Sequence, residues 1–336
     1  LRERPVMRQL RPCRTPVLCI PDSVDFMTFA LPDVRVALYT ANVGKTIHML
    51  REPGVRHVFI GHGDSDKSAS ANPFSKVYSE IWVAGEAGRD RYRRANIGIH
   101  GDDIMEVGRP QLSGIASHTG PIPGGELTVL YAPTWEGWTN DPAHTSVIRT
   151  GPRLVEQLLA LPDVRVIYKP HPTTGSVSSA AAASDARIRE SIARASRPGA
   201  PRHEVAVGIS PGLYDCFNAC DVLVADISSV LTDFMESQKP YVVPNLTGLD
   251  DDAFRAAFPS ASAAYLLDPA AEQIGATLDL IRASDPLAAR RHDLKHYLLG
   301  PDDPDALTRF IAAVDAAYDR AVALCPVRPT LAATAV

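Results

Sequence analysis

The sequence predicts an α/β protein built from two doubly wound halves that face a central cleft. Its 336 residues exceed the usual size of one hydrophobic core and fit two domains of roughly 150 residues each. Strand-like and helix-like segments alternate along the chain, which is the rhythm of βαβ units with parallel sheets. A stretch rich in Gly, Ser and Pro, residues 113–126, separates the two sets of units.

The first half, residues 1–120, contains apolar runs that are typical of buried strands. We expect strands over 34–40, 56–61 and 80–85 and helices over 44–52 and 86–96. The chain opens with Leu1 rather than Met, so we expect it to be part of a longer sequence. Its first residues are rich in arginine, which favours either a segment lying against an anionic membrane surface or a solvated tail.

The second half, residues 121–303, repeats the alternation. We expect strands within 127–133, 164–172, 221–226 and 241–244 and helices over 151–162, 180–197 and 228–237. Residues 304–325 have helical periodicity and would form a long closing helix. Residues 326–336 would then be a frayed tail.

Composition excludes several classes of protein. A hydrophobic share of 45% and a charged share of 22% are those of an ordinary globular protein. The formal net charge of -5 gives no electrostatic footprint for nucleic acid, and no run of 18 apolar residues predicts a membrane span. Five cysteines without closely spaced pairs argue against a disulfide framework or a zinc site and favour a cytosolic chain. Cys216 and Cys220 are expected as small apolar core residues.

Polar side chains follow the predicted strands of both halves. Because the cleft of such a fold lies at the carboxyl ends of its parallel strands, these side chains should carry the function. They are His62, Gly63, Thr134 to Glu136, His171, Asp226, Ser228 and Ser229.

The segment ADISSVLTDF places Ser228 and Ser229 where a strand ends and a helix begins. Unpaired amides at a helix start, at the positive end of its dipole, favour a phosphate group. A serine that merely caps its helix is the alternative.

In KPHP, prolines alternate with Lys169 and His171. Proline holds the backbone extended, so residues 169 and 171 should point to the same side. A lysine and a protonated histidine aimed together suit a diphosphate, whereas an isolated motif of this kind is usually an exposed turn.

The pair Asp64 and Asp66 raises the question of a metal ion. Two carboxylates could hold a magnesium ion that bridges a nucleotide diphosphate. We favour a site without metal, because Lys67 adjoins the pair and can neutralise it.

Several motifs occur together in a fixed order: GHGDSDK, SKVYSEIWVAGE, GRP at 108–110, LYAPTWEG, YKPHP and ISPGLYDCFNACDVLVADISSVLTDFMESQKPYVV. Over about residues 35–245, this order resembles the CDP-glycerol glycerophosphotransferase family of teichoic acid synthesis, poly(glycerol phosphate) polymerases and primases with a GT-B fold of two Rossmann-like domains. The resemblance implies that residues 1–120 form the acceptor-side domain and residues 121–303 the nucleotide-binding domain. It further implies that an acceptor hydroxyl attacks the β-phosphorus of CDP-glycerol and releases CMP.

The resemblance also assigns roles to residues. His62 matches the family's HG histidine, the general base on the acceptor hydroxyl, a role that suits a group titrating near neutral pH. His171 would contact the diphosphate and steady the departing charge, and Ser228 and Ser229 would bind the β-phosphate. Contacts with substrate are further expected from Gly63, Lys67, Arg109, Thr134, Lys169 and Asp226, and no cofactor is implied.

The sequence departs from the family pattern at two of these motifs. Many members read HGTPLKK where this chain has HGDSDKS, and TDYSS where it has ADISS. The donor could therefore be CDP-glycerol, CDP-ribitol or another CDP-polyol, and the acceptor a lipid-linked or polymeric hydroxyl. The resemblance implies a peripheral enzyme at the cytoplasmic face of the membrane. Two alternatives remain: a GT-B glycosyltransferase or UDP-sugar 2-epimerase, and a non-catalytic module that senses a nucleotide.

Overall fold

The computed structural model describes residues 1, 4–7, 15–29, 33–42, 44, 48–67, 70–118, 120, 122, 124–137, 145–196, 201–208 and 211–327. Most of the arginine-rich opening stretch and most of the predicted tail lie outside these residues. In the described part of the chain, no helix is long and apolar enough to cross a membrane.

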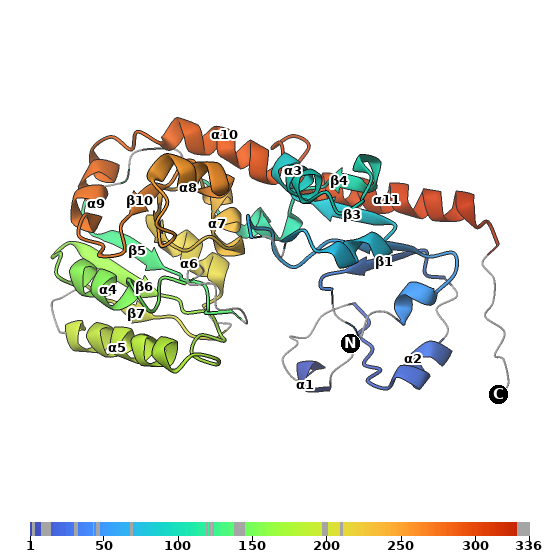
Figure 1. Ribbon diagram of the computed structural model, residues 1–336, viewed down its shortest axis with the longest axis horizontal. Coiled ribbons are helices and arrows are strands. Elements are labelled where there is room, and N and C mark those ends of the chain that lie inside the picture. Colours follow the sequence, from blue (N-terminus) through green and yellow to red (C-terminus); the bar gives the residue numbers. More distant parts are fainter. Residues whose placement is uncertain are drawn as a thin grey trace.

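Two parallel sheets confirm the predicted α/β class (Figure 1). The first sheet has the order β1-β2-β3-β4. Its strands and main helix are β1 (Val36–Tyr39), β2 (Arg56–Phe59), β3 (Glu80–Val83), α3 (Glu86–Ala95) and β4 (Ile104–Glu106). Short helices α1 (Arg4–Met7) and α2 (Ser23–Thr28) precede it.

The second sheet has six parallel strands in the order β10-β9-β8-β5-β6-β7. The strands are β5 (Leu127–Tyr131), β6 (Val164–Tyr168), β7 (Glu204–Val205), β8 (Val222–Val224), β9 (Tyr241–Pro244) and β10 (Tyr265–Leu267). The helices are α4 (Gly151–Leu159), α5 (Ser179–Ala195), α6 (Leu213–Ala219), α7 (Ser229–Phe234), α8 (Asp251–Ala257), α9 (Ile274–Ala283), α10 (Ala288–Leu299) and α11 (Ala306–Leu324).

Both faces of the second sheet are buried, which explains why its strands read as continuous apolar runs. Every residue of β5 and β8 is buried. Alternate residues face opposite sides: Leu130 and Leu223 join the cluster with α6 and α7, whereas Val129 and Val222 join the cluster with α4, α5 and α9. Helices therefore pack on both sides and hold the strand ends in place.

The end of the chain returns to the first sheet. Helix α10 contacts α3, and α11 contacts β1 and β2 (Figure 1). Ala313 and Ala317 on α11 pack with Val58 and Trp82 of the first sheet. The segment predicted as a closing helix thus covers one face of the first sheet, whereas α10, which contacts both α3 and the 3-10 turn Met235–Ser237, links the two domains.

One predicted element differs from the structure. The helix expected over 44–52 is seen only as a 3-10 turn, Met49–Arg51, and residues 45–47 lie outside the described part. The three-residue strands β4 and β10 and the two-residue strand β7 were not predicted.

Candidate active site

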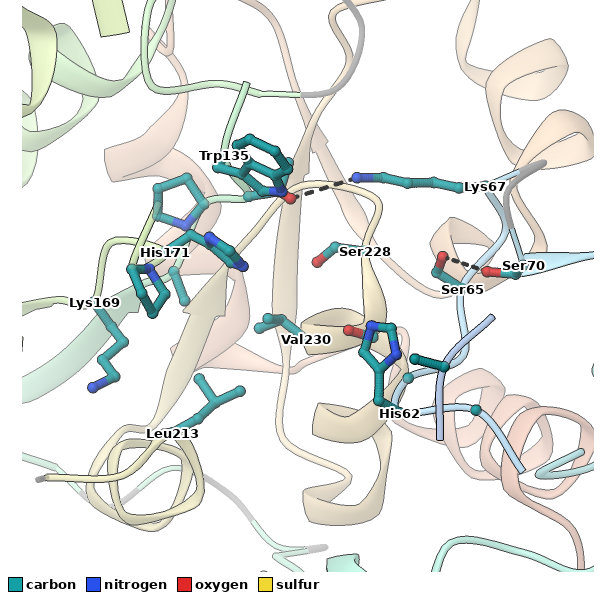
Figure 2. A pocket seen from close by; sticks show the side chains of 18 of the residues that line it. His62, Ser65, Lys67, Ser70, Trp135, Lys169, His171, Leu213, Ser228 and Val230 are labelled. Carbon is teal, nitrogen blue, oxygen red and sulfur yellow. Dashed lines mark hydrogen bonds between the residues drawn. The ribbon is translucent and has the colours of Figure 1, made fainter. Parts of the chain in front are cut away.

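A cavity of about 720 Å³ lies between the two domains, at the carboxyl ends of strands from both sheets (Figure 2). It brings together eight of the ten predicted site residues. They are His62, Gly63, Lys67, Thr134, Lys169, His171, Ser228 and Ser229. Arg109 and Asp226 lie behind its wall, where they hold other groups in position.

His62 follows β2 directly after Gly61, whose φ of 62° is left-handed and suits glycine. Its imidazole is exposed, and Nδ1 lies 3.0 Å from the carbonyl oxygen of Thr40. A carbonyl oxygen only accepts, so Nδ1 is the donor. In the neutral ring, Nε2 is then an acceptor, the arrangement needed to take a proton.

His171 has the opposite arrangement. Its Nδ1 accepts from the backbone N–H of Thr173 at 3.2 Å and lies 2.7 Å from the Thr173 hydroxyl. Nε2 therefore carries the hydrogen in the neutral ring and can donate to a ligand. Burial and the nearby charge of Lys67 lower the pKa of His171, so the neutral form is favoured.

Trp135 and Glu136, which the sequence singled out by position but without a specific role, support the loop that carries His171. The ring of Trp135 stacks on that of His171 with centroids 5.8 Å apart (Figure 2). Glu136 accepts from the backbone N–H groups of Gly175, Val177 and Ser178, each at 3.0 Å. Although burial opposes this, these donors hold the pKa of Glu136 below its ordinary value. Their position at the end of β5 was the available signal.

Ser228 and Ser229 form the start of α7. Ser228 is buried, and its hydroxyl has no hydrogen-bond partner among the described residues. The hydroxyl lies at the cavity (Figure 2). A buried polar group without a partner carries a free-energy cost that a bound ligand can relieve. The alternative that the Ser228 side chain caps the helix is wrong, because Ser228 makes no side-chain cap hydrogen bond.

The contact between Gly63 and Ser229 explains why glycine follows His62. A Cβ placed on Gly63 would lie 2.8 Å from Ser229 Cβ and 2.9 Å from its Oγ. Carbon atoms do not approach so closely, so any side chain at position 63 would have to displace Ser229. Gly63 thus permits the first domain to lie directly against α7.

Lys169 lines the cavity as His171 does, but its ammonium is turned away from the space that His171 faces. Its ammonium donates to the carbonyl oxygens of Gly208 and Pro211, each at 2.8 Å. Figure 2 shows the two side chains diverging. A lysine has several rotatable bonds, so a shared backbone direction does not determine where its charge lies. Lys67 instead reaches across the cleft, with Nζ 3.5 Å from the hydroxyl of Thr134.

Asp226 fixes the backbone at the end of β5. Its two oxygens accept from the N–H groups of Thr134 at 2.9 Å and Ser146 at 3.1 Å. Burial raises the pKa of Asp226 to about 6, and these donors and Lys67 oppose the rise. Asp226 therefore acts on the cavity through Thr134, whose backbone it holds.

Asp64 and Asp66 are both paired with an arginine. Arg91 forms ion pairs with Asp64 and, at 3.6 Å, with Asp66. Asp66 also accepts from the backbone N–H of Ser260 in the second domain at 2.7 Å. No group of three or more metal-binding side chains occurs in the described ranges. The acids thus anchor the loop between His62 and Lys67.

Two domains with parallel sheets that meet at a shared cleft are the architecture of the GT-B fold. Residues 64–246, more than half of the chain, match the family described as CDP-Glycerol:Poly(glycerophosphate) glycerophosphotransferase. The chain belongs to this family and is an enzyme of the CDP-glycerol glycerophosphotransferase type. No curated protein matches the sequence.

Solved structures agree on the fold. A histidine-to-alanine variant of the wall teichoic acid polymerase TagF is 13% identical with a TM-score of 0.53, covering 85% of this chain and 74% of that one. A TagF variant soaked with CDPG is 12% identical with a TM-score of 0.52, covering 85% and 73%. A putative UDP-N-acetylglucosamine 2-epimerase from Listeria monocytogenes is 13% identical with a TM-score of 0.51, covering 85% and 75%.

Proposed function

We propose that this enzyme transfers glycerol phosphate, or a related polyol phosphate, from a CDP-polyol to a hydroxyl group of a lipid-linked or polymeric acceptor and releases CMP. The observation that carries the proposal is a pair of histidines at one cavity whose Nδ1 atoms make opposite hydrogen bonds. His62 offers an acceptor nitrogen, and His171 offers a donor N–H. A phosphoryl transfer to a hydroxyl is accelerated by one of each: a base for the hydroxyl proton and a donor for the developing charge.

In the proposed reaction, Nε2 of His62 takes the proton of the acceptor hydroxyl as its oxygen attacks the β-phosphorus. A new oxygen–phosphorus bond forms, and the bond from the β-phosphorus to the bridging oxygen of the diphosphate breaks. CMP leaves with the bonding electrons, and the proton stays on His62. The N–H of His171 donates to the oxygens on which negative charge develops.

Ser228 and Ser229 support the assignment of the β-phosphate to the start of α7. The Ser228 hydroxyl, which has no hydrogen-bond partner in the described part of the chain, can donate to a phosphate oxygen, and Ser229 lies beside Gly63 next to the base. Lys67 adds a positive charge on the opposite wall of the cavity. These groups would stabilise the transferring phosphoryl group by position and charge.

Membrane association is a further part of the proposal, since a lipid-linked acceptor lies at a bilayer. We expect peripheral binding at the cytoplasmic face, aided by the arginine-rich opening residues. Flotation with vesicles of anionic and of neutral lipid measures this. Recovery with the anionic vesicles only is expected, and equal failure with both would contradict it.

Titration calorimetry with CDP, CDP-glycerol, CDP-ribitol, UDP and UDP-N-acetylglucosamine, with and without magnesium, tests the donor class. We expect tight binding of a CDP-polyol without metal, followed by CMP release when a glycerol phosphate primer is added. A preference for uridine nucleotides, with products altered at a sugar carbon, would favour a glycosyltransferase or epimerase. Nucleotide binding without turnover on any acceptor would favour the sensing module.

A further inference from the structure

A buried ion pair joins the two domains beside the cavity. Arg109, after β4 in the first domain, and Asp233, on α7 in the second, are 7% and 6% exposed. Nε of Arg109 lies 2.8 Å from Oδ1 of Asp233, and Nη2 lies 3.4 Å from Oδ2. Burial raises the pKa of Asp233, and the Arg109 charge opposes this.

Each partner of this ion pair contacts a further residue. Nη2 of Arg109 lies 3.4 Å from the carbonyl oxygen of His62, and the hydroxyl of Tyr214 donates to Asp233 at 3.0 Å. A continuous set of contacts therefore runs from the backbone of His62 to α7. The same helix begins with Ser229, against which Gly63 packs.

Taking two charges out of water costs free energy, so a buried ion pair is weak evidence for a gain in stability. It is better evidence that one geometry is fixed. Here the geometry that is fixed is the distance between His62 and the first residues of α7. Reacting groups must be held within a fraction of an ångström, and a displacement of about 1 Å costs roughly 10²-fold in rate.

We propose that Arg109 is a positioning residue rather than a substrate contact: with Asp233 it sets the register of the two domains, so that His62 faces the phosphate site at α7. The inference rests on the proposed function for its kinetic consequence. Its geometric part, that the pair holds the domains in one arrangement, stands on the contacts alone.

The kinetic test compares Arg109→Lys, Arg109→Ala and the double variant Arg109→Leu/Asp233→Leu with the wild-type chain. Lysine keeps the charge but lacks the second nitrogen that reaches His62, and the double variant removes both buried charges together. We expect kcat to fall about 10- to 100-fold in all three, with the Kd for CDP changed less than about twofold. Melting temperature should fall in Arg109→Ala and recover in the double variant while kcat stays low.

Recovery of kcat together with melting temperature in the double variant would overturn the proposal and leave a purely structural role. A loss of CDP affinity as large as the loss of kcat would show that Arg109 contacts the substrate, as the resemblance implied. Arg153→Ala is the matched control, because Arg153 pairs with Glu272 at 2.7 Å on the exposed surface. It should leave kcat unchanged.

A second measurement does not depend on the reaction. Spin labels at Arg93→Cys on α3 and Arg187→Cys on α5, in a background without other accessible cysteines, report the distance between the domains by double electron–electron resonance. We expect one narrow distribution in the wild-type background and a broadened or shifted one in Arg109→Ala. An unchanged distribution would overturn the proposal even if activity fell. A changed distribution would support it even if CDP-polyols proved not to be the substrates.

Discussion

The loops that carry His62 and His171 follow strands in different domains. Their backbones make opposite hydrogen bonds to the two imidazole rings. In the first loop, a backbone carbonyl occupies Nδ1 of His62 and leaves Nε2 as an acceptor. In the second, a backbone N–H occupies Nδ1 of His171 and leaves Nε2 as a donor. The comparison teaches that the backbone beside a histidine, rather than the histidine itself, decides whether it can act as base or as donor.

The two loops also differ in how they are held. The His171 loop is supported within its own domain, by Trp135 and by Glu136. The His62 loop depends on Arg91, on Arg109 and, across the domain boundary, on the backbone of Ser260. We therefore expect nucleotide binding to survive changes in the first domain that abolish turnover.

The largest expected effect is that of His62→Ala. Loss of a general base should lower kcat by about two to four orders of magnitude while the Kd for CDP stays nearly constant. CMP release and titration calorimetry measure the two quantities. His100→Ala is the control, since His100 is an exposed histidine of the same domain. A parallel fall of affinity and turnover would show that His62 binds rather than catalyses.

The second largest expected effect is the loss of kcat on replacing His171, the proposed hydrogen-bond donor. His171→Ala should lower kcat by about 10²- to 10³-fold, as loss of one donor to developing charge does, whereas His171→Gln keeps an N–H donor and should retain more activity. Steady-state kinetics of both variants at one pH provide the test. Equal loss in the two would mean that the ring, stacked on Trp135, matters more than its hydrogen bond.

Gly63→Ala tests the contact between the loop of His62 and α7. The added methyl group meets Ser229 and must displace it, so we expect about a tenfold loss of kcat from the shifted geometry. Gly124→Ala is the matched control, because among the described residues, apart from its chain neighbours, no atom lies within 4 Å of a Cβ at that position. Full activity of Gly63→Ala would show that the domains do not need this close approach.

Much of the cavity could be predicted from sequence for one physical reason. Parallel strands end at the same edge of a sheet, so His62, His171 and Ser228 could be placed at one cleft before any coordinates. What could not be predicted depends on side-chain direction and on distant pairs. Arg109 and Asp233 are separated by 124 positions, and neither neighbourhood signals the other. The ring arrangements of the histidines likewise depend on loop backbone geometry that no motif encodes.

The smallest expected effect concerns the pKa of His171. Burial is the largest cause that lowers this pKa, the charge of Lys67 lowers it further, and the charge of Glu136 raises it. The folded pKa thus lies below the unfolded value of about 6.5, so the unfolded chain binds the proton first as pH falls. The contribution of neutral His171 to stability is complete above about pH 6.5 and is lost at lower pH.

Lys67→Met isolates one of these causes. Without that positive charge, the pKa of His171 should move upward, towards its ordinary value, while the burial by Trp135 remains. Titration of the His171 ring signals by NMR measures this, with exposed Lys76→Met as the control for loss of a lysine. A downward movement, or an equal one in the control, would mean that Lys67 does not act on the donor histidine. The charge that crosses the cleft from the first domain would then leave the second domain's donor unaffected, and the two loops would be electrostatically independent.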